Sequence, residues 1–141
     1  MRLSCTDLIK KYNDKKVVDN ISINLEAKKV IGLLGPNGAG KTTTFYMLVG
    51  LIKCNSGAIE IDDEDITQLP MHLRSDLGIS YLPQEASIFK NLNVRDNIMA
   101  ILETRKGLTA QQRISKLKSL VSTLQIEKIL DNNGASLSGG E

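Results

Sequence analysis

The residues Gly35–Thr42 read Gly-Pro-Asn-Gly-Ala-Gly-Lys-Thr and match the pattern G-x-x-x-x-G-K-[ST] at every fixed position. Glycines at this spacing let the backbone curl until successive N–H groups point inward at phosphate oxygens. A merely structural glycine-rich turn does not need a lysine and a hydroxyl residue directly after its last glycine. The stretch therefore predicts a phosphate loop, the name used below for Gly35–Thr42.

The flanks of the phosphate loop are of the kind that this motif requires. Val30–Leu34 is continuously apolar, which predicts a strand buried on both faces of a parallel sheet. Thr42–Leu51 reads as a helix, whose positive N-terminal end would face the phosphates. Lys41 can reach the β- and γ-phosphates of a nucleotide, and the Thr42 hydroxyl can ligate Mg²⁺. Nucleotide binding with Mg²⁺ is the expected chemistry.

The residues before and after this region predict antiparallel β-structure. Ile21, Ile23 and Leu25 alternate with polar residues, a period of two that buries one face of a strand. Leu3–Tyr12 is the expected partner strand, and Ala58–Ile61 is a further short one.

Pro70 is expected to open a short helix with Met71 and Leu73 turned inward. Ile79–Leu82 reads as a second buried strand, because it is apolar and stops at Pro83. From about Val94 to Leu130 the pattern is helical and contains no convincing strand.

Within this helical part, Thr109 and Gln112 have the spacing of a capping box. The run that they open carries an apolar stripe made of Ile114, Leu117, Val121 and Leu124. An amphipathic helical insert therefore follows the mixed α/β start.

Composition excludes several classes of protein. The chain has 141 residues, enough for one domain, and a formal net charge of +2, which argues against a nucleic-acid partner. No apolar run approaches the roughly 20 residues that span a bilayer. The first residues lack the apolar core of a signal peptide, so a cytoplasmic location is expected. Cys5 and Cys54 have no metal-like spacing and read as reduced thiols.

Two further segments indicate which phosphate-loop family this is. Gln84 follows the expected strand Ile79–Leu82, just off the end of the sheet where strand ends converge on a ligand. The sequence closes with Leu137-Ser138-Gly139-Gly140-Glu141. The order of phosphate loop, glutamine, helical insert and LSGGE signature resembles the ATPases of ABC transporters. Three stretches are similar in particular to the ATPase subunits of bacterial lipopolysaccharide exporters: Gly32–Leu51, Asp65–Arg74 and Tyr81–Glu103.

The resemblance implies a role for each matching residue. Tyr12 would stack on adenine, and Gln84 would complete the Mg²⁺ shell with Thr42 and sense the γ-phosphate. Lys41 and Gln84 would be the catalytic residues, and ATP and Mg²⁺ the ligands. The residues around the phosphates would be Gly35, Pro36, Asn37, Gly38, Ala39, Gly40, Lys41, Thr42 and Thr43.

The resemblance also implies the assembly. Ser138, Gly139 and Gly140 would bind the γ-phosphate held by the other subunit of a head-to-tail homodimer. The dimer would lie on the cytoplasmic face of the inner membrane and couple ATP hydrolysis to permease subunits that export lipopolysaccharide. Phe89 would contact the permease, or else pack locally on the helical insert.

The expected fold is α/β, a P-loop NTPase core with an antiparallel β subdomain and a helical insert, truncated after the signature. Within this partial ATPase domain of 1–141, the core would span about 1–86, the insert about 87–135 and the signature 137–141. Members of the family carry a Walker B aspartate, a catalytic glutamate and a switch histidine beyond the signature. We therefore expect these 141 residues to be an N-terminal part that does not hydrolyse ATP alone.

Two local features could imitate the missing groups. The acidic run within Ile59–Asp65 alternates polar and apolar residues, so it reads as a solvent-facing strand and turn and not as a displaced Walker B strand. His72, the only histidine, reads as a surface residue of the short helix.

Other functions remain open from the residues. Asp131–Gly134 fits the D-x-x-G of GTPases, although no N-K-x-D follows, and scattered arginines in the insert make a weak case for a nucleotide kinase. A subunit of another ABC transporter, a truncated module that docks on a permease without turning over ATP, and a nucleic-acid-directed ABC ATPase are further alternatives.

Overall fold

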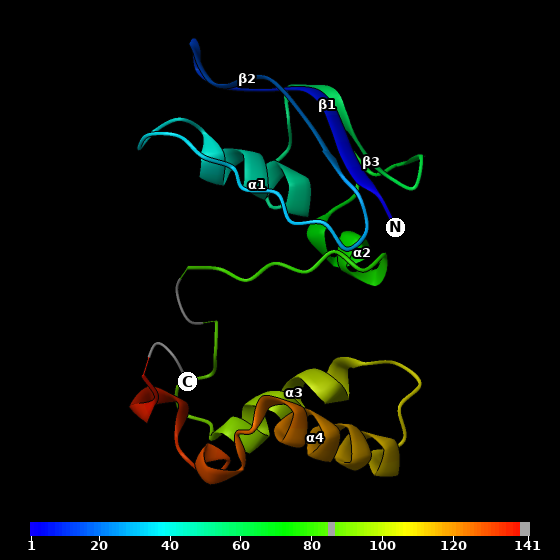
Figure 1. Cartoon of the computed structure of the whole chain (residues 1–141), viewed down its shortest axis with the longest axis vertical. Coiled ribbons are helices and arrows are strands. Elements are labelled where there is room, and N and C mark those ends of the chain that lie inside the picture. Colours follow the sequence, from blue (N-terminus) through cyan, green and yellow to red (C-terminus); the bar gives the residue numbers. More distant parts are fainter. Residues whose placement is uncertain (85–86, 139–141) are drawn as a thin grey trace. The chain divides into compact units, whose positions relative to one another are not determined.

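The computed structural model describes residues 1–84 and 87–138. The chain divides into two compact units, Met1–Tyr81 and Leu82–Glu141, and each is described by itself. The first unit contains a sheet and two helices, and the second is helical (Figure 1).

The sheet of the first unit is antiparallel, as the alternating pattern predicted. Its strands are β1 (Leu3–Tyr12), β2 (Lys15–Leu25), β3 (Ser56–Ile61) and β4 (Glu64–Asp65). They lie in the order β2-β1-β3-β4, and every pair is antiparallel. The prediction of an antiparallel β subdomain is confirmed.

The acidic run near residue 60 forms the tight hairpin between β3 and β4. Asp62 and Asp63 occupy its two turn positions with φ of 47° and 69°, the positive values of a type I′ turn. Ile59 and Ile61, both in β3, have buried side chains, whereas the turn residues Asp62 and Asp63 are exposed. The run is therefore strand and turn, as expected.

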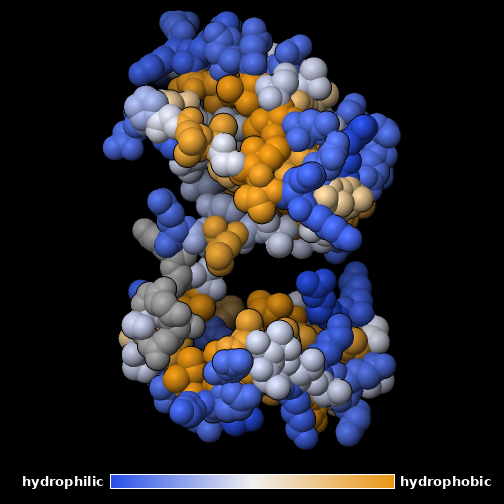
Figure 2. Space-filling model, in the orientation of Figure 1, coloured by the Kyte–Doolittle hydropathy of each residue, from blue (hydrophilic) through white to orange (hydrophobic). Residues whose placement is uncertain are grey.

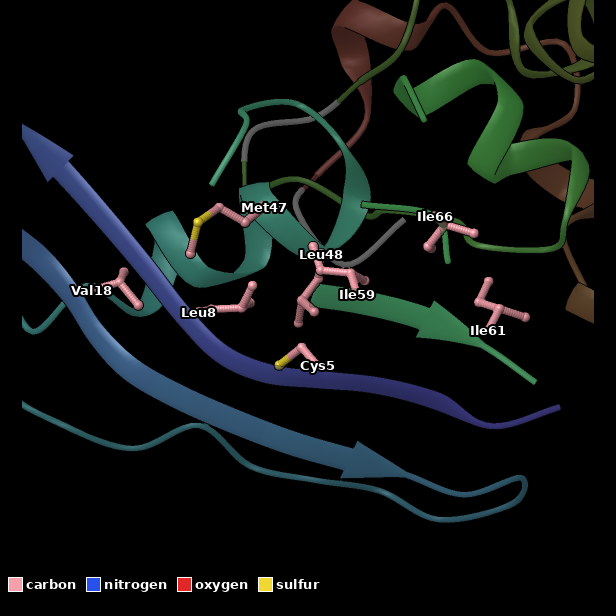
Figure 3. Packing of buried hydrophobic residues seen from close by; sticks show 8 residues of the cluster. All are labelled: Cys5, Leu8, Val18, Met47, Leu48, Ile59, Ile61 and Ile66. Carbon is pink, nitrogen blue, oxygen red and sulfur yellow. The ribbon is translucent and has the colours of Figure 1, made fainter. Parts of the chain in front are cut away.

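One helix covers a face of this sheet. This helix, α1 (Lys41–Val49), contacts β1 and β2 (Figure 1). Its Met47 and Leu48 meet side chains of the strands, and Figure 3 shows the resulting core. The buried members of this core are Cys5, Leu8, Val18, Met47, Leu48, Ile59, Ile61 and Ile66.

Two predicted buried strands do not form in the described residues. Val30–Leu34 has no strand structure, and Val30 and Leu34 are 98% and 92% exposed. Ile79–Leu82 is also irregular, with Leu82 92% exposed. A strand needs a hydrogen-bonded neighbour, and none of the described strands pairs with either segment. Apolar surface remains visible on this unit (Figure 2).

The short helix after Pro70 forms, but with a different inner face. It is α2 (Met71–Asp76), and both Met71 and Leu73 are exposed, contrary to the prediction. Arg74 is the buried residue of α2. Its guanidinium donates hydrogen bonds to the main-chain carbonyl groups of Met47 and Leu48 in α1. His72 is exposed, as predicted.

The second unit is helical, as predicted for the insert. Its α-helices are α3 (Val94–Thr104) and α4 (Ala110–Leu124), which pack on each other. Two short 3₁₀ turns follow, η1 (Glu127–Ile129) and η2 (Gly134–Ser136).

The capping box at the start of α4 is confirmed. Thr109 accepts a hydrogen bond from the Gln112 backbone, and the Gln112 side chain accepts one from the Thr109 N–H. The predicted apolar stripe of α4 is buried only in its middle. Leu117 and Val121 pack with Leu102 of α3, whereas Ile114 and Leu124 are exposed at the ends.

Both cysteines are free thiols, as expected. Burial in the sheet core raises the pKa of Cys5, which makes it a poor nucleophile. Over residues 1–84 and 87–138, no helix combines the length and apolar character that crossing a membrane needs.

Candidate functional site: the phosphate loop

The phosphate loop leads into α1 through a left-handed residue. Gly40 has φ 82° and precedes the first helical residue, Lys41. The Ala39 N–H donates to the Pro36 carbonyl over 3.2 Å, and the Thr44 N–H donates to the Gly40 carbonyl over 2.8 Å. One backbone hydrogen bond therefore closes a turn within the loop, and the first hydrogen bond of α1 follows directly.

Gly40 is fixed in place by close packing on β2. A Cβ atom built on Gly40 would lie 2.2 Å from the Val17 carbonyl oxygen, a distance that no side chain tolerates. Gly38 has nearly the same φ, 80°, but its Cβ would meet nothing within 4 Å. The two glycines therefore have different roles, since only Gly40 sets how closely the loop approaches the sheet.

The ammonium group of Lys41 lies over the loop. Its Nζ donates to the carbonyl oxygens of Gly35 and Pro36 over 2.8 and 2.7 Å. A Cβ on Gly35 would lie 3.3 Å from the Ala39 Cβ and 4.0 Å from the Lys41 Cδ, so it would crowd the loop interior. A bare backbone at Gly35, a cation and a helix N-terminus are the donor set that suits phosphate groups. The residues present fit a nucleotide.

Arg74 holds the other end of α1. It is 2% exposed, and its Nη1 donates to the carbonyl oxygens of Met47 and Leu48 over 2.8 and 2.7 Å. Its Nε and Nη2 donate to the carbonyl groups of Leu69 and Thr67 over 2.8 and 2.9 Å. A cation at a helix C-terminus is electrostatically favourable. Burial lowers the pKa of this guanidinium, which nevertheless stays protonated because arginine titrates far above neutral pH.

Tyr12 lies at the end of β1, where it pairs with Lys15 across the hairpin. Its ring is half exposed, and the Lys10 ammonium lies 5.3 Å from the ring centroid. The same Lys10 Nζ donates to the Lys53 carbonyl over 2.6 Å. The structure thus gives Tyr12 an accessible ring, with a cation held against it.

The segment that leads to Gln84 touches α1 through an aromatic pair. The rings of Tyr46 and Tyr81 meet edge to face, with centroids 6.0 Å apart. Burial is the main cause that raises the pKa of Tyr81, and its hydrogen bond with Tyr46 adds to it. Gln84 itself belongs to the second unit and its side chain is exposed.

Phe89 projects from the second unit beside an apolar hollow. The Phe89 side chain is 58% exposed. The hollow has a volume of about 340 Å³, and it is lined by Ser87, Ile88, Phe89, Asn97, Ile98, Ile101, Leu102 and Leu120. The sequence left two alternatives for Phe89, an exposed contact or a ring packed on the insert. In the structure the side chain is largely exposed and also lines a hollow of the insert.

The signature is described only in part. Ser138 is exposed, and Gly139 and Gly140 lie outside the described residues. Leu137 follows the η2 turn directly in the sequence, and it is half-buried.

Two residues with defined local roles did not emerge from the sequence. Arg74 stands between Leu73 and Ser75, and nothing in its local sequence distinguishes it from a solvent-facing charge. Asn97 gave a weak signal, because asparagine inside a helix often bonds to nearby backbone groups instead. Its side chain bonds to the backbone of Phe89 and Leu92.

Gly40→Ala should disrupt the phosphate loop much more than Gly38→Ala. Both substitutions place alanine at a left-handed φ, which costs about 1–2 kcal/mol, but only the first drives a Cβ into the Val17 carbonyl. We expect the free energy of unfolding, measured in urea, to fall by at least about 2 kcal/mol more for Gly40→Ala. Equal losses for the two variants would contradict the packing described for Gly40.

Arg74→Met should strongly destabilise the protein. The change removes the donor of four hydrogen bonds to main-chain carbonyl groups, two of them buried and two part-buried, and breaking such a network costs about 3–5 kcal/mol. Urea unfolding measures the loss, and His72→Ala, on the exposed side of the same helix, is the control. A loss for Arg74→Met within about 0.5 kcal/mol of the control would show that α1 does not depend on Arg74.

Proteins with similar sequences are named for ATP binding. The chain is 55% identical over 139 residues to the lipopolysaccharide export system ATP-binding protein LptB of Haemophilus influenzae and 50% identical to that of Escherichia coli, in each case over 99% of this chain and 58% of the relative. The chain thus spans somewhat more than half the length of these curated relatives.

The fold matches solved structures at low sequence identity. An ATP-binding cassette of an ABC transporter in its ADP conformation aligns with a TM-score of 0.82 at 23% identity, over 99% of this chain and 60% of that one. A nucleotide-free cassette aligns with the same TM-score and coverage. These similarities show that the chain has the α/β fold of those two cassettes, as predicted. The profile of the ABC transporter family matches residues 18–141, and the chain belongs to that family.

Proposed function

We propose that this chain is the ATP-binding part of a subunit that drives lipopolysaccharide export. The observation that carries the proposal is the phosphate loop, with the Lys41 ammonium over its carbonyl groups and α1 starting at its end. The identity of 55% and 50% to relatives named for lipopolysaccharide export supports the choice of cargo.

The residues of the loop would act on the phosphates of ATP. Main-chain N–H groups at the start of α1 and the Lys41 ammonium would neutralise the β- and γ-phosphates. To do so, Lys41 would leave the carbonyl groups of Gly35 and Pro36 that it now contacts. The half-exposed ring of Tyr12 offers a face on which adenine would stack, a contact typically worth about 1–3 kcal/mol.

Thr42 and Gln84 are the residues that would hold Mg²⁺, through hydroxyl and amide oxygens. Both side chains are exposed and so are accessible to an ion. The ion would supply positive charge to the phosphates during hydrolysis. In that reaction, a water oxygen attacks the γ-phosphorus, the bond to the β–γ bridging oxygen breaks, and ADP, phosphate and a proton are released.

A second copy of the protein would complete the site. We propose a head-to-tail homodimer in which Ser138, Gly139 and Gly140 approach the γ-phosphate bound by the other subunit. In this arrangement the core of about 1–86 holds the nucleotide, and the signature at 137–141 closes over it. The insert of about 87–135 would carry the contact to the membrane.

The permease would dock at Phe89, on the cytoplasmic face of the inner membrane. An aromatic ring exposed beside an apolar hollow is typical of the centre of a protein interface. The partner would be an apolar segment of a membrane subunit that covers Phe89 and enters the hollow.

Reconstitution tests the proposed function. The full protein, combined in proteoliposomes with the lipopolysaccharide-export membrane subunits of its own organism, should release lipopolysaccharide only when ATP and Mg²⁺ are present. Lys41→Ala should lower release at least about tenfold, because it removes the cation that faces the phosphates. Lys29→Ala, an exposed lysine of the same unit, is the matched control and should retain release. Release that survives Lys41→Ala, or no release by the unmodified protein, would contradict the proposal.

A further inference from the structure

The side chain of Asn97 closes the segment that presents Phe89. Its Oδ1 accepts the Phe89 N–H over 2.8 Å, and its Nδ2 donates to the Phe89 carbonyl over 3.1 Å. The same Nδ2 lies 3.3 Å from the Leu92 carbonyl and 3.0 Å from the Asn93 carbonyl. One amide therefore binds the backbone of Phe89 on both sides of its Cα.

The residues Phe89–Leu92 form a turn, named the Phe89 turn here. The Leu92 N–H donates to the Phe89 carbonyl over 3.0 Å and closes it. On another side of the turn, the Gly134 N–H donates to the Leu92 carbonyl over 2.8 Å, and the Ala135 N–H donates to the Lys90 carbonyl over 3.0 Å. The backbone of the turn is thus held by α3 and by η2.

Asn97 is not needed to cap α3. That task belongs to Asn93, whose Oδ1 accepts the Asp96 N–H over 2.7 Å at the start of the helix. Asn97 is the fourth residue of α3, and asparagine is a mediocre helix former at such a position. Its amide points instead toward the turn, so the residue serves the turn more than the helix.

The arrangement combines a fixed backbone with an exposed side chain. The Phe89 ring is 58% exposed although both backbone polar groups of Phe89 are bonded to Asn97. A side chain presented on an ordered backbone loses less conformational entropy when a partner covers it. Asn97 also lines the apolar hollow beside Phe89, so it shapes both parts of the surface.

We propose that Asn97 is a positioning residue that preorganises Phe89 for docking on the membrane subunit. The inference rests on the proposed function, because that function supplies the partner. Asn97 acts through the Phe89 turn and has no role in binding the nucleotide.

Asn97→Asp isolates the amide with almost no change of shape. The aspartate keeps an acceptor for the Phe89 N–H but replaces the donor by a carboxylate oxygen. That oxygen would face the carbonyl groups of Phe89, Leu92 and Asn93, with which it cannot form hydrogen bonds. Asn132→Asp, an equal change of charge at an exposed position, is the matched control.

The experiment is a double-mutant cycle on binding to the purified membrane subunits. Phe89→Ala should weaken binding about 30-fold, as truncation of a central interface aromatic does. Asn97→Asp should weaken binding about tenfold, and adding it to Phe89→Ala should weaken binding no further, because its effect passes through Phe89. Asn132→Asp should bind like the unmodified protein.

A second readout reports the turn itself without any partner. Trypsin cleaves after Lys90, which lies inside the Phe89 turn, and mass spectrometry identifies the cut. Asn97→Asp should accelerate this cleavage several-fold, whereas ATP affinity and cleavage at lysines of the first unit should stay unchanged.

The outcomes separate the two proposals. If Phe89→Ala binds normally, the permease contact of the proposed function fails, and the inference falls with it. If Phe89→Ala weakens binding but Asn97→Asp does not, the inference alone is overturned. It is also overturned if the two effects add fully in the double variant, or if cleavage after Lys90 is unchanged by Asn97→Asp.

Discussion

The contact of the Gly40 backbone with the Val17 carbonyl is the constraint on which the first unit depends. It places the end of the phosphate loop against β2 at a distance that only glycine permits, and α1 begins at the next residue. Burial of Met47 and Leu48 then fixes that helix on the sheet (Figure 3). The N-terminal end of α1, where we propose that phosphate binds, is therefore set by packing on the strands.

Arg74 completes this constraint from the opposite end of α1. Its guanidinium joins the last turn of the helix to the backbone at Thr67 and Leu69, so the helix is held at both ends. The second unit uses a neutral amide, Asn97, in a related way. In both places one buried or half-buried polar side chain satisfies several carbonyl groups and orders a segment that apolar packing alone would leave loose.

The antiparallel sheet and the helical insert could be predicted because their signals are local. Alternation in β2 and the Thr109 capping box each specify structure within a few residues. Val30–Leu34 was predicted wrongly because an apolar run becomes a strand only beside a partner, and hydrophobicity does not reveal whether one is present. Met71 and Leu73 were predicted to turn inward but are exposed, because the buried position of α2 belongs to Arg74, whose guanidinium bonds to carbonyl groups distant in the sequence. The phosphate loop could be proposed from the sequence because the residues of its motif are consecutive.

The most direct test of the central claim is to record the backbone amide resonances of the full protein while Mg²⁺ and ATP are added. If the phosphate loop is the nucleotide site, the amides of Gly38, Gly40 and Lys41 should shift most, with a saturating dependence on ATP. Those of the β3–β4 hairpin should not move. Saturable shifts elsewhere, with the loop amides unchanged, would contradict the assignment of the phosphate loop as the ATP site.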